Sequence, residues 1–162
     1  MGKLWLLLLC GMIFAGCGAE QTLETVVDEP VVQVLAEPRE IFVALPDDSV
    51  LPAMESDGRT LYLCRGYDVA VQTFSSGDIN ATVQQLCGFD SSELTILETM
   101  SGENRCYDFV WTAATDLGEQ VGRAKILDDG DFHYSLTAMA PAEKASEYQE
   151  IWSGMFETFG IG

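Results

Sequence analysis

The fold is decided in the second half of the chain by the stretch Cys106-Tyr107-Asp108-Phe109-Val110-Trp111-Thr112-Ala113. Three aromatic residues, Tyr107, Phe109 and Trp111, alternate here with other side chains. In a β-strand alternate side chains point to the same face of the sheet. This period of two therefore predicts a strand over residues 106–113, with the three rings on one face.

Further strands are expected on both sides of this stretch. Short turns separate them at Ser101-Gly102-Glu103-Asn104, at residues 115–118 and at Asp128-Asp129-Gly130-Asp131, and the last of these has a composition typical of hairpins. Strands joined by such short turns are antiparallel. The second half thus predicts a four-stranded meander, with strands over residues 94–100, 106–113, 120–127 and 132–139.

The first half adds strands and one short helix. The expected strands cover residues 41–45, 60–64 and 67–74. Arg65-Gly66 is the expected hairpin turn between the last two, and residues 47–57 are expected to form a loop. Asp78 is typical of a helix N-cap, and apolar residues then recur on one helical face until Gly88 ends the helix.

A longer helix is expected near the C-terminus, with Pro141 at its start and Glu143 in its first turn. Its apolar residues recur at steps of three and four, so they form one stripe that should pack on a sheet. The stripe consists of Ala145, Tyr148, Trp152, Met155, Phe156 and Phe159. Together these elements predict an α+β fold, in which a short helix and a long C-terminal helix flank an antiparallel sheet of about six to seven strands.

This order of elements resembles the PsbP-like (Mog-type) α/β/α sandwich family. The shared features are an early hairpin, a short capped helix, a meander through Trp111 and His133-Tyr134, and a long aromatic C-terminal helix. The resemblance covers roughly residues 40–160. It implies a sandwich that acts mainly by binding larger assemblies, and it brings no catalytic motif with it.

The N-terminus reads as a bacterial lipoprotein signal. Lys3 precedes an apolar run over residues 4–14, which is shorter than the roughly 20 residues of a membrane-spanning helix. The run ends in Phe14-Ala15-Gly16-Cys17, which is similar to a lipobox. An ordinary secretory signal that happens to contain a cysteine is the alternative.

From this signal we expect three segments. Residues 1–16 are removed as the signal peptide, and Cys17 receives a diacylglyceryl group that anchors the protein on the extracytoplasmic face of the cell membrane. Residues 17–38 form an acidic tether, within which residues 31–35 could add a short strand. Residues 39–162 form a single domain.

The composition excludes some partners. The chain has 8 Lys and Arg against 26 Asp and Glu, a formal net charge of −18. Nucleic-acid binding needs basic patches for the phosphates, so nucleic acid is not an expected partner. Cys64, Cys87 and Cys106 match no zinc spacing, and neither a metal nor another cofactor is expected. Either one pair of these three forms a disulfide, with the pairing unknown, or all stay reduced.

Few side chains are candidates for chemistry. His133 is the single histidine and a candidate general base, but no G-x-S-x-G nucleophile motif accompanies it. Arg123 either forms a cross-strand ion pair or contacts an anion. The carboxylates of residues 128–131 suit either calcium or a simple hairpin turn.

These observations favour a membrane-anchored, extracytoplasmic lipoprotein that acts as a non-enzymatic binding or accessory module of the cell envelope. Its partners would be the membrane, through the anchor, and an envelope protein or a small ligand. The alternative is an extracytoplasmic hydrolase that uses His133. For a binding module the contact surface is expected on loops, of which residues 47–58 form the longest.

Overall fold

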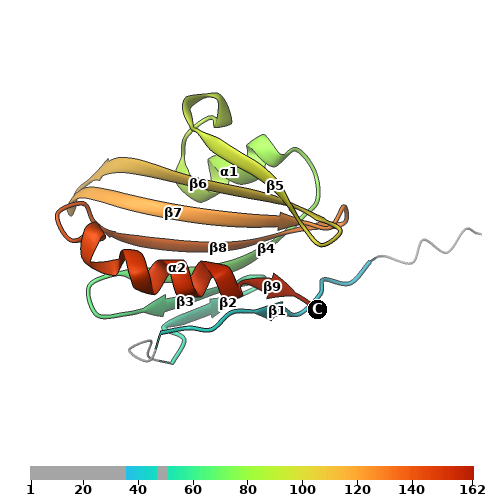
Figure 1. The fold of residues 1–162 in the computed structure, drawn as a ribbon, viewed down its shortest axis with the longest axis horizontal. Coiled ribbons are helices and arrows are strands. Elements are labelled where there is room, and N and C mark those ends of the chain that lie inside the picture. The colour runs from blue at the N-terminus through green and yellow to red at the C-terminus, as the bar shows by residue number, and fades with distance from the viewer. Residues whose placement is uncertain (1–35, 47–50) are drawn as a thin grey trace, which may run out of the picture. The chain divides into compact units, whose positions relative to one another are not determined.

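Seven strands form one antiparallel sheet in this computed structural model, which describes residues 36–46 and 51–162. Their order across the sheet is β2-β3-β4-β8-β7-β6-β5 (Figure 1). The strands are β2 Met54–Ser56, β3 Arg59–Leu63, β4 Asp68–Ser75, β5 Ile96–Ser101, β6 Asn104–Thr115, β7 Gly118–Asp128 and β8 Phe132–Pro141. The predicted α+β class and meander are therefore confirmed.

The sheet has two parts that join in its centre. Strands β5 to β8 follow one another as hairpins, while β3 and β4 form the hairpin predicted around Arg65-Gly66. The two parts meet because β4 pairs antiparallel with β8, from Asp68 opposite Met139 to Ser75 opposite Phe132. This long-range pairing fixes which side chains of the two halves lie side by side.

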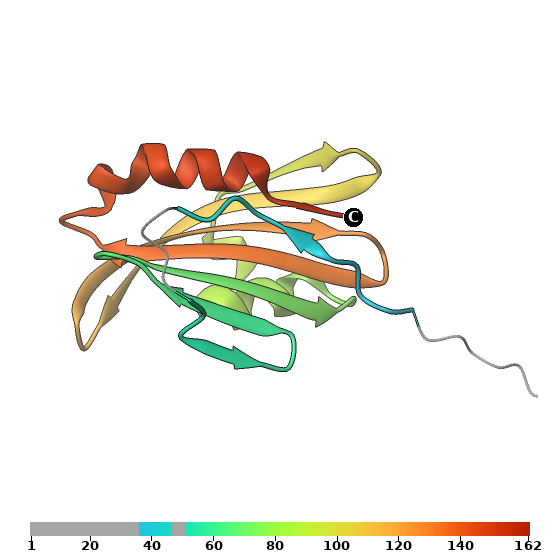
Figure 2. The same ribbon diagram turned by 90° about the horizontal axis from the view of Figure 1, so that it is seen from below.

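Two helices lie on opposite faces of the sheet (Figure 2). Helix α1, Ile79–Cys87, begins after Asp78, whose side chain accepts a hydrogen bond from the Asn80 amide at 3.0 Å. It ends at Gly88, whose φ of 81° is the left-handed conformation that glycine adopts most easily. Helix α2, Gln149–Thr158, follows the 3₁₀ turn η2, Ala145–Tyr148. A second 3₁₀ turn, η1, covers Ser91–Glu93.

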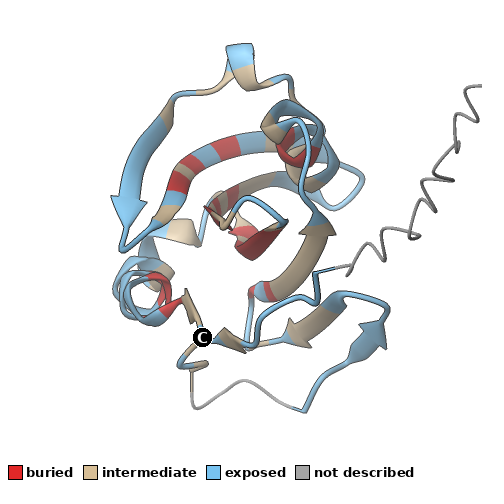
Figure 3. Cartoon of the chain, turned by 90° about the vertical axis from the view of Figure 1, so that its right-hand side faces the viewer, coloured by how far each residue is buried: buried red, intermediate tan, exposed pale blue. Residues whose placement is uncertain are grey.

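Each helix packs on one face of the sheet and covers a separate apolar core there. On the α2 face, side chains of β4 and β8 such as Val69, Tyr134 and Leu136 pack with the predicted stripe of the helix. On the α1 face, Val83 packs with the aromatic side chains of β6. Figure 3 shows the buried positions on the central strands and helices, whereas the edge strands β2 and β5 are largely exposed. The rings of Tyr107, Phe109 and Trp111 share one face, as predicted.

The segment before the sheet is docked on the domain. Strand β1, Ile41–Phe42, pairs with β9, Gly160–Ile161, in a separate two-stranded sheet. The strand predicted over residues 41–45 is thus shorter than expected. Just ahead of it, the Arg39 amide donates a hydrogen bond to the Tyr134 hydroxyl at 2.8 Å.

Two further expectations need correction. Pro141 ends β8 instead of starting a helix, and the α-helix begins eight residues later, at Gln149. A proline fits at the end of β8, where it pairs with Gln120 at the last position of the ladder. The loop expected over residues 47–57 contains β2, because Asp57-Gly58 makes a tight turn with Gly58 at a φ of 72°. Asp-Gly is itself a hairpin signal.

Some expectations concern residues that the structure does not describe. The signal, Cys17, residues 31–35 and residues 47–50 fall outside the described residues. Within the described ranges, no helix is long and apolar enough to cross a bilayer.

Candidate functional site

His133 lies in the interior between α1 and the sheet. Its side chain is 1% exposed, with Nδ1 2.8 Å from the Thr82 hydroxyl of α1 and Nε2 3.8 Å from an Asp128 carboxylate oxygen. Burial lowers the pKa of His133, and the nearby Asp128 and Asp129 oppose that shift. The ring is therefore neutral at pH 7, and it connects the helix to the strand.

A catalytic triad consists of a nucleophile, a base and an acidic residue, and Thr82, His133 and Asp128 lie next to one another in that order. A nucleophile must reach its substrate, and Thr82 is only 5% exposed, although it helps to line a surface hollow beside the start of α1. His133 is absent from the linings of the described surface hollows. The arrangement thus has the order of a catalytic triad, but the 3.8 Å between Nε2 and the Asp128 carboxylate is longer than a hydrogen bond.

Arg123 forms an ion pair instead of facing solvent alone. Its guanidinium donates two hydrogen bonds to Asp108, at 2.7 and 3.1 Å, and lies 4.4 Å above the centre of the Phe156 ring. Two parallel bonds to one carboxylate fix the guanidinium plane. Of the two alternatives for Arg123, the geometry is that of the cross-strand ion pair.

The carboxylates of residues 128–131 are used by the turn between β7 and β8. Asp128 accepts a hydrogen bond from the Gly130 amide, and Asp129 accepts from the amides of Asp131 and Phe132. Burial alone would raise the pKa of Asp129, but these hydrogen bonds outweigh it and lower that pKa. The turn therefore accounts for its acidic composition.

The three cysteines of the domain are spread over it. Cys87 packs in the core on the α1 face and Cys106 in the core on the α2 face, so the sheet separates them. Cys64 directly follows β3 and lies beside Tyr67. Cys106 lies in the same row of the sheet as Tyr134, and this row is six residues, or roughly 20 Å, further along the strands than Tyr67. A disulfide within this set stays a prediction.

One hollow of the domain runs beside α2, and we call it the α2 groove. It has a volume of about 650 Å³ and lies between η2, α2 and the outer strands β5, β6 and β7. Its lining residues are Leu97, Asp108, Val110, Val121, Arg123, Ala145, Ser146, Gln149, Trp152 and Ser153. The groove exists because α2 covers the centre of the sheet and leaves this outer part of the same face open.

The α2 groove exposes apolar side chains, and one of its residues has a hydrogen-bond donor without a partner. Leu97 and Val110 are 62% and 54% exposed, and both line this groove. Trp152 is 5% exposed, and its buried Nε1 has no hydrogen-bond partner. The Arg123–Asp108 pair neutralises the charges on the groove wall.

The sequence could identify only part of this site. Arg123 stood out because basic residues are few, but Leu97 and Val110 looked like ordinary strand residues. Their exposure depends on where α2 crosses the sheet, which no local pattern specifies. The loop expected to carry the binding surface is partly strand β2, and its residues 47–50 lie outside the described residues.

No protein-family model matches the chain, and no curated protein matches it in sequence. Solved structures with a similar backbone do exist. A protein from Bacteroides thetaiotaomicron VPI-5482 aligns over 75% of this chain at 11% identity and a TM-score of 0.51. This chain spans only 45% of the length of that protein. At such an identity the likeness concerns the fold alone.

Two smaller proteins align less closely. LpqN, which is involved in cell envelope biogenesis of Mycobacterium tuberculosis, aligns over 77% of this chain and 86% of its own, at 14% identity and a TM-score of 0.47. Cyanobacterial PsbP from Synechocystis sp. PCC 6803 aligns over 80% and 96%, at 6% identity and a TM-score of 0.44. The second of these belongs to the family that the order of elements resembles.

Proposed function

We propose that this protein is a lipid-anchored, extracytoplasmic binding module of the cell envelope, and that its α2 groove holds an extended segment of a partner protein. The anchor would be the diacylglyceryl group on Cys17. The observation that carries the proposal is an open groove with exposed Leu97 and Val110 on one wall and, on the other, Trp152, whose buried Nε1 has no hydrogen-bond partner.

An extended peptide suits this groove better than a small polar ligand does. A peptide supplies apolar side chains for Leu97 and Val110, and its carbonyl groups can accept a hydrogen bond from the indole N–H of Trp152 once a side-chain shift uncovers this buried donor. The groove also borders β5, an edge strand among the described strands, whose outer backbone groups can pair with an added strand. Lifted by an acidic tether, the domain could reach a partner at the membrane.

Site-specific photo-crosslinking in intact cells tests this proposal. A photoreactive amino acid is placed at Leu97, and the matched control places it at Glu98, the exposed neighbour that points to the opposite face of β5. We expect a discrete crosslinked protein from position 97 and none from position 98. Equal products from both positions, or none from 97, would contradict a partner in the α2 groove.

A second candidate is an extracytoplasmic hydrolase, favoured by the contacts of Thr82 and Asp128 with His133. It requires a substrate that reaches the Thr82 hydroxyl from the hollow that Thr82 helps to line, since this residue is only 5% exposed. A turnover of ester or amide substrates that disappears in Thr82→Val, while the folded state persists, would establish this candidate.

A further inference from the structure

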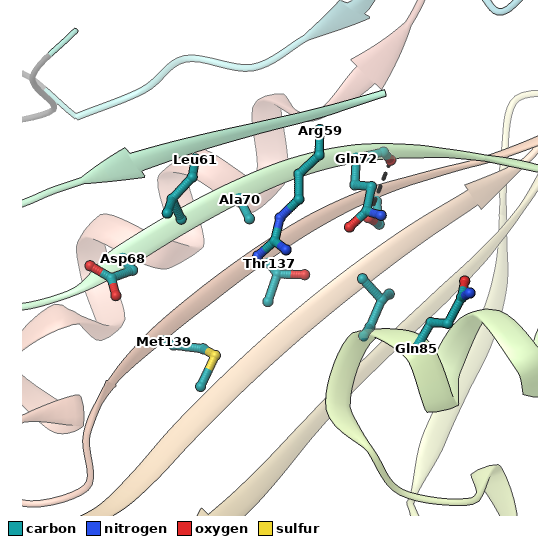
Figure 4. A pocket seen from close by; sticks show the side chains of 10 residues that line it. Arg59, Leu61, Asp68, Ala70, Gln72, Gln85, Thr137 and Met139 are labelled. Carbon is teal, nitrogen blue, oxygen red and sulfur yellow. Dashed lines mark hydrogen bonds between the residues drawn. The ribbon is translucent and has the colours of Figure 1, made fainter. Parts of the chain in front are cut away.

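A second hollow lies on the opposite face of the sheet, between α1 and strands β3, β4 and β8, and we call it the α1 pocket (Figure 4). Strand register explains why it is hollow. Leu61 lies opposite Ala70 and Ala70 opposite Thr137, so a single methyl group occupies the middle of the floor. Longer side chains surround it, among them Arg59 and Met139, and the enclosed volume is about 220 Å³.

The α1 pocket carries one group of each charge. Arg59 comes from β3 and Asp68 from β4, and Figure 4 shows them on different sides of Ala70. Among the described residues Arg59 takes part in none of the ion pairs, and neither does Asp68. Burial raises the pKa of Asp68, as expected for a carboxylate that has no cation beside it.

The floor of the pocket contains a polar group without a partner. Thr137 is 7% exposed, and its Oγ1 is buried with no hydrogen bond. Ser135, two residues earlier on the same strand and on the same face, donates its hydroxyl to the Gln72 carbonyl at 3.2 Å. Buried hydroxyls nearly always have a partner, so the unpaired hydroxyl of Thr137 points to a ligand in the pocket.

The spacing of the charged groups restricts the ligand. Arg59 and Asp68 lie on either side of the row that contains Leu61 and Ala70. Measured along the strands, their backbone positions are about 13 Å apart. Their side chains shorten this span towards the middle. An α-amino acid is too short to bridge it, whereas a dipeptide extends over roughly 7 Å. The volume also lies below the roughly 300–1,000 Å³ of clefts that hold larger organic ligands.

We propose that the α1 pocket binds a short zwitterionic peptide of about two residues, with its carboxylate on Arg59, its ammonium group on Asp68 and a carbonyl oxygen on the Thr137 hydroxyl. A simple anion fits less well because Asp68 repels it, and a simple cation fits less well because Arg59 does. Arg59 is exposed and takes part in none of the ion pairs among the described residues, so its side chain can adjust to hold the carboxylate. This site lies on the face opposite the α2 groove and is independent of the function proposed for that groove.

The first test uses four probes on the full-length lipidated protein in detergent micelles. Isothermal titration compares the dipeptide Ala-Leu with its N-acetylated form, its C-terminal amide and free leucine. We expect Ala-Leu to bind at least tenfold more tightly than each of the other three. Equal binding of all four probes, or no binding of Ala-Leu at millimolar concentration, overturns the proposal and leaves an ordered water as the partner of Thr137.

The second test uses variants of the pocket. Arg59→Gln and Ala70→Leu should each weaken Ala-Leu binding at least tenfold, the first by removing the cation and the second by filling the floor without any change of charge. Lys144→Gln, in an exposed turn, is the control for net charge and should bind like the wild type. Thr137→Val should weaken binding several-fold, and a purely structural Thr137 would leave the affinity unchanged. Thermal melts identify variants that fail to fold. If Ala70→Leu does not fold, Arg59→Gln decides the test, because it changes only an exposed residue.

Discussion

His133 joins α1 to the sheet through one hydrogen bond and one carboxylate contact. Thr82 lies 2.8 Å from Nδ1 on the helix side, and Asp128 lies 3.8 Å from Nε2 at the end of β7. A neutral imidazole can share a hydrogen bond with the Thr82 hydroxyl without a charge, while its other nitrogen faces the Asp128 carboxylate at a distance beyond a hydrogen bond. The structure therefore gives the single histidine a local structural role.

This arrangement predicts a loss of stability in mild acid. The pKa of His133 is lowered in the folded state by burial, while in the unfolded chain it lies near the ordinary value of about 6.5. Below that pH the unfolded chain binds a proton that the folded protein excludes, so the free energy of unfolding should fall between pH 7 and pH 5.

Urea titrations at both pH values measure this effect in the wild type and in His133→Gln, which keeps an amide for the Thr82 contact. The variant should lose less stability than the wild type. Asp68, whose pKa burial raises, titrates in both proteins, so the difference isolates His133. An equal loss in both proteins would show that another group is responsible.

Two glycines predict opposite effects of the same substitution. Gly122 lies opposite Trp111 across the β6–β7 ladder, and a Cβ at this position would overlap the indole ring. Gly154 lies in α2 with open space around it. Gly122→Ala should lower the free energy of unfolding by about 1–3 kcal/mol, whereas Gly154→Ala should raise it by about 0.5–1 kcal/mol. Chemical denaturation measures both, and a Gly122→Ala protein as stable as the wild type would rule out the close Trp111 contact.

At the scale of single residues, the sequence predicts the role of a residue when that role depends on near neighbours in the chain. The N-cap Asp78 and the glycine at the end of α1 needed only local patterns. Thr137 could not be identified, because its missing partner follows from the β4–β8 register, which places it opposite Ala70, 67 positions away in the chain. Arg123 was a fair candidate, but only its position opposite Val110 and next to Asp108 decides between the two alternatives.

The C-terminal helix is held to the sheet by its buried stripe and by one cation. Trp152, Met155 and Phe156 are buried on the sheet side. Lys125 of β7 donates a hydrogen bond to the Phe156 carbonyl at 3.0 Å, close to the negative end of the helix dipole. The helix thus gains both apolar burial and electrostatic attachment, and its fixed position forms one wall of the α2 groove.

The docking of α2 predicts a contrast between two adjacent residues. Trp152→Ala should destabilise the protein by about 3–5 kcal/mol, as large-to-small changes in a core do. Ile151→Ala changes a residue that is 41% exposed, and its effect should stay within about 0.5 kcal/mol. Thermal melting monitored by circular dichroism distinguishes them. If the two variants melted alike, the helix would not be docked through Trp152.

The elements themselves were largely predictable because alternation and turn residues mark them locally. The strand pairs around Gly66, Gly102 and Gly130 formed where the turns indicated. The start of the last helix was misplaced, because proline is common both at helix starts and after strands, and only the ladder to Gln120 shows which applies here. Strand β2 was missed although Asp57-Gly58 is a recognised hairpin turn, because few apolar residues alternate in it.

On the scale of the whole molecule, one sheet presents a different hollow on each face. The α2 groove is wide and apolar, and the α1 pocket is small and carries both charges. This division follows from two short helices that cover a seven-stranded sheet only in part. Under the two proposals, a protein partner would occupy the α2 groove on one face and a small ligand would occupy the α1 pocket on the other.

The proposed anchor makes a prediction for the full chain. Cys17 follows Ala15-Gly16 at the end of an apolar segment, and two acyl chains at ~0.8 kcal/mol per buried CH₂ hold a protein stably on a bilayer. Radiolabelled fatty acid should therefore enter the wild type and not Cys17→Ser, and the variant should leave the membrane fraction. Equal labelling of the two proteins would show that Cys17 carries no lipid.

The central claim is that the domain works by contact in the α2 groove and not by chemistry at His133, and one in-cell crosslinking measurement tests it most directly. A photoreactive residue at Val110, in the groove, is combined with either Leu97→Glu, which places a charge on the groove wall, or Thr82→Val, which removes the hydroxyl that is hydrogen-bonded to His133. Contact in the groove predicts that the crosslinked partner is lost with Leu97→Glu and kept with Thr82→Val. A partner that persists with Leu97→Glu and disappears with Thr82→Val, in variants that fold as the wild type does, would contradict the account.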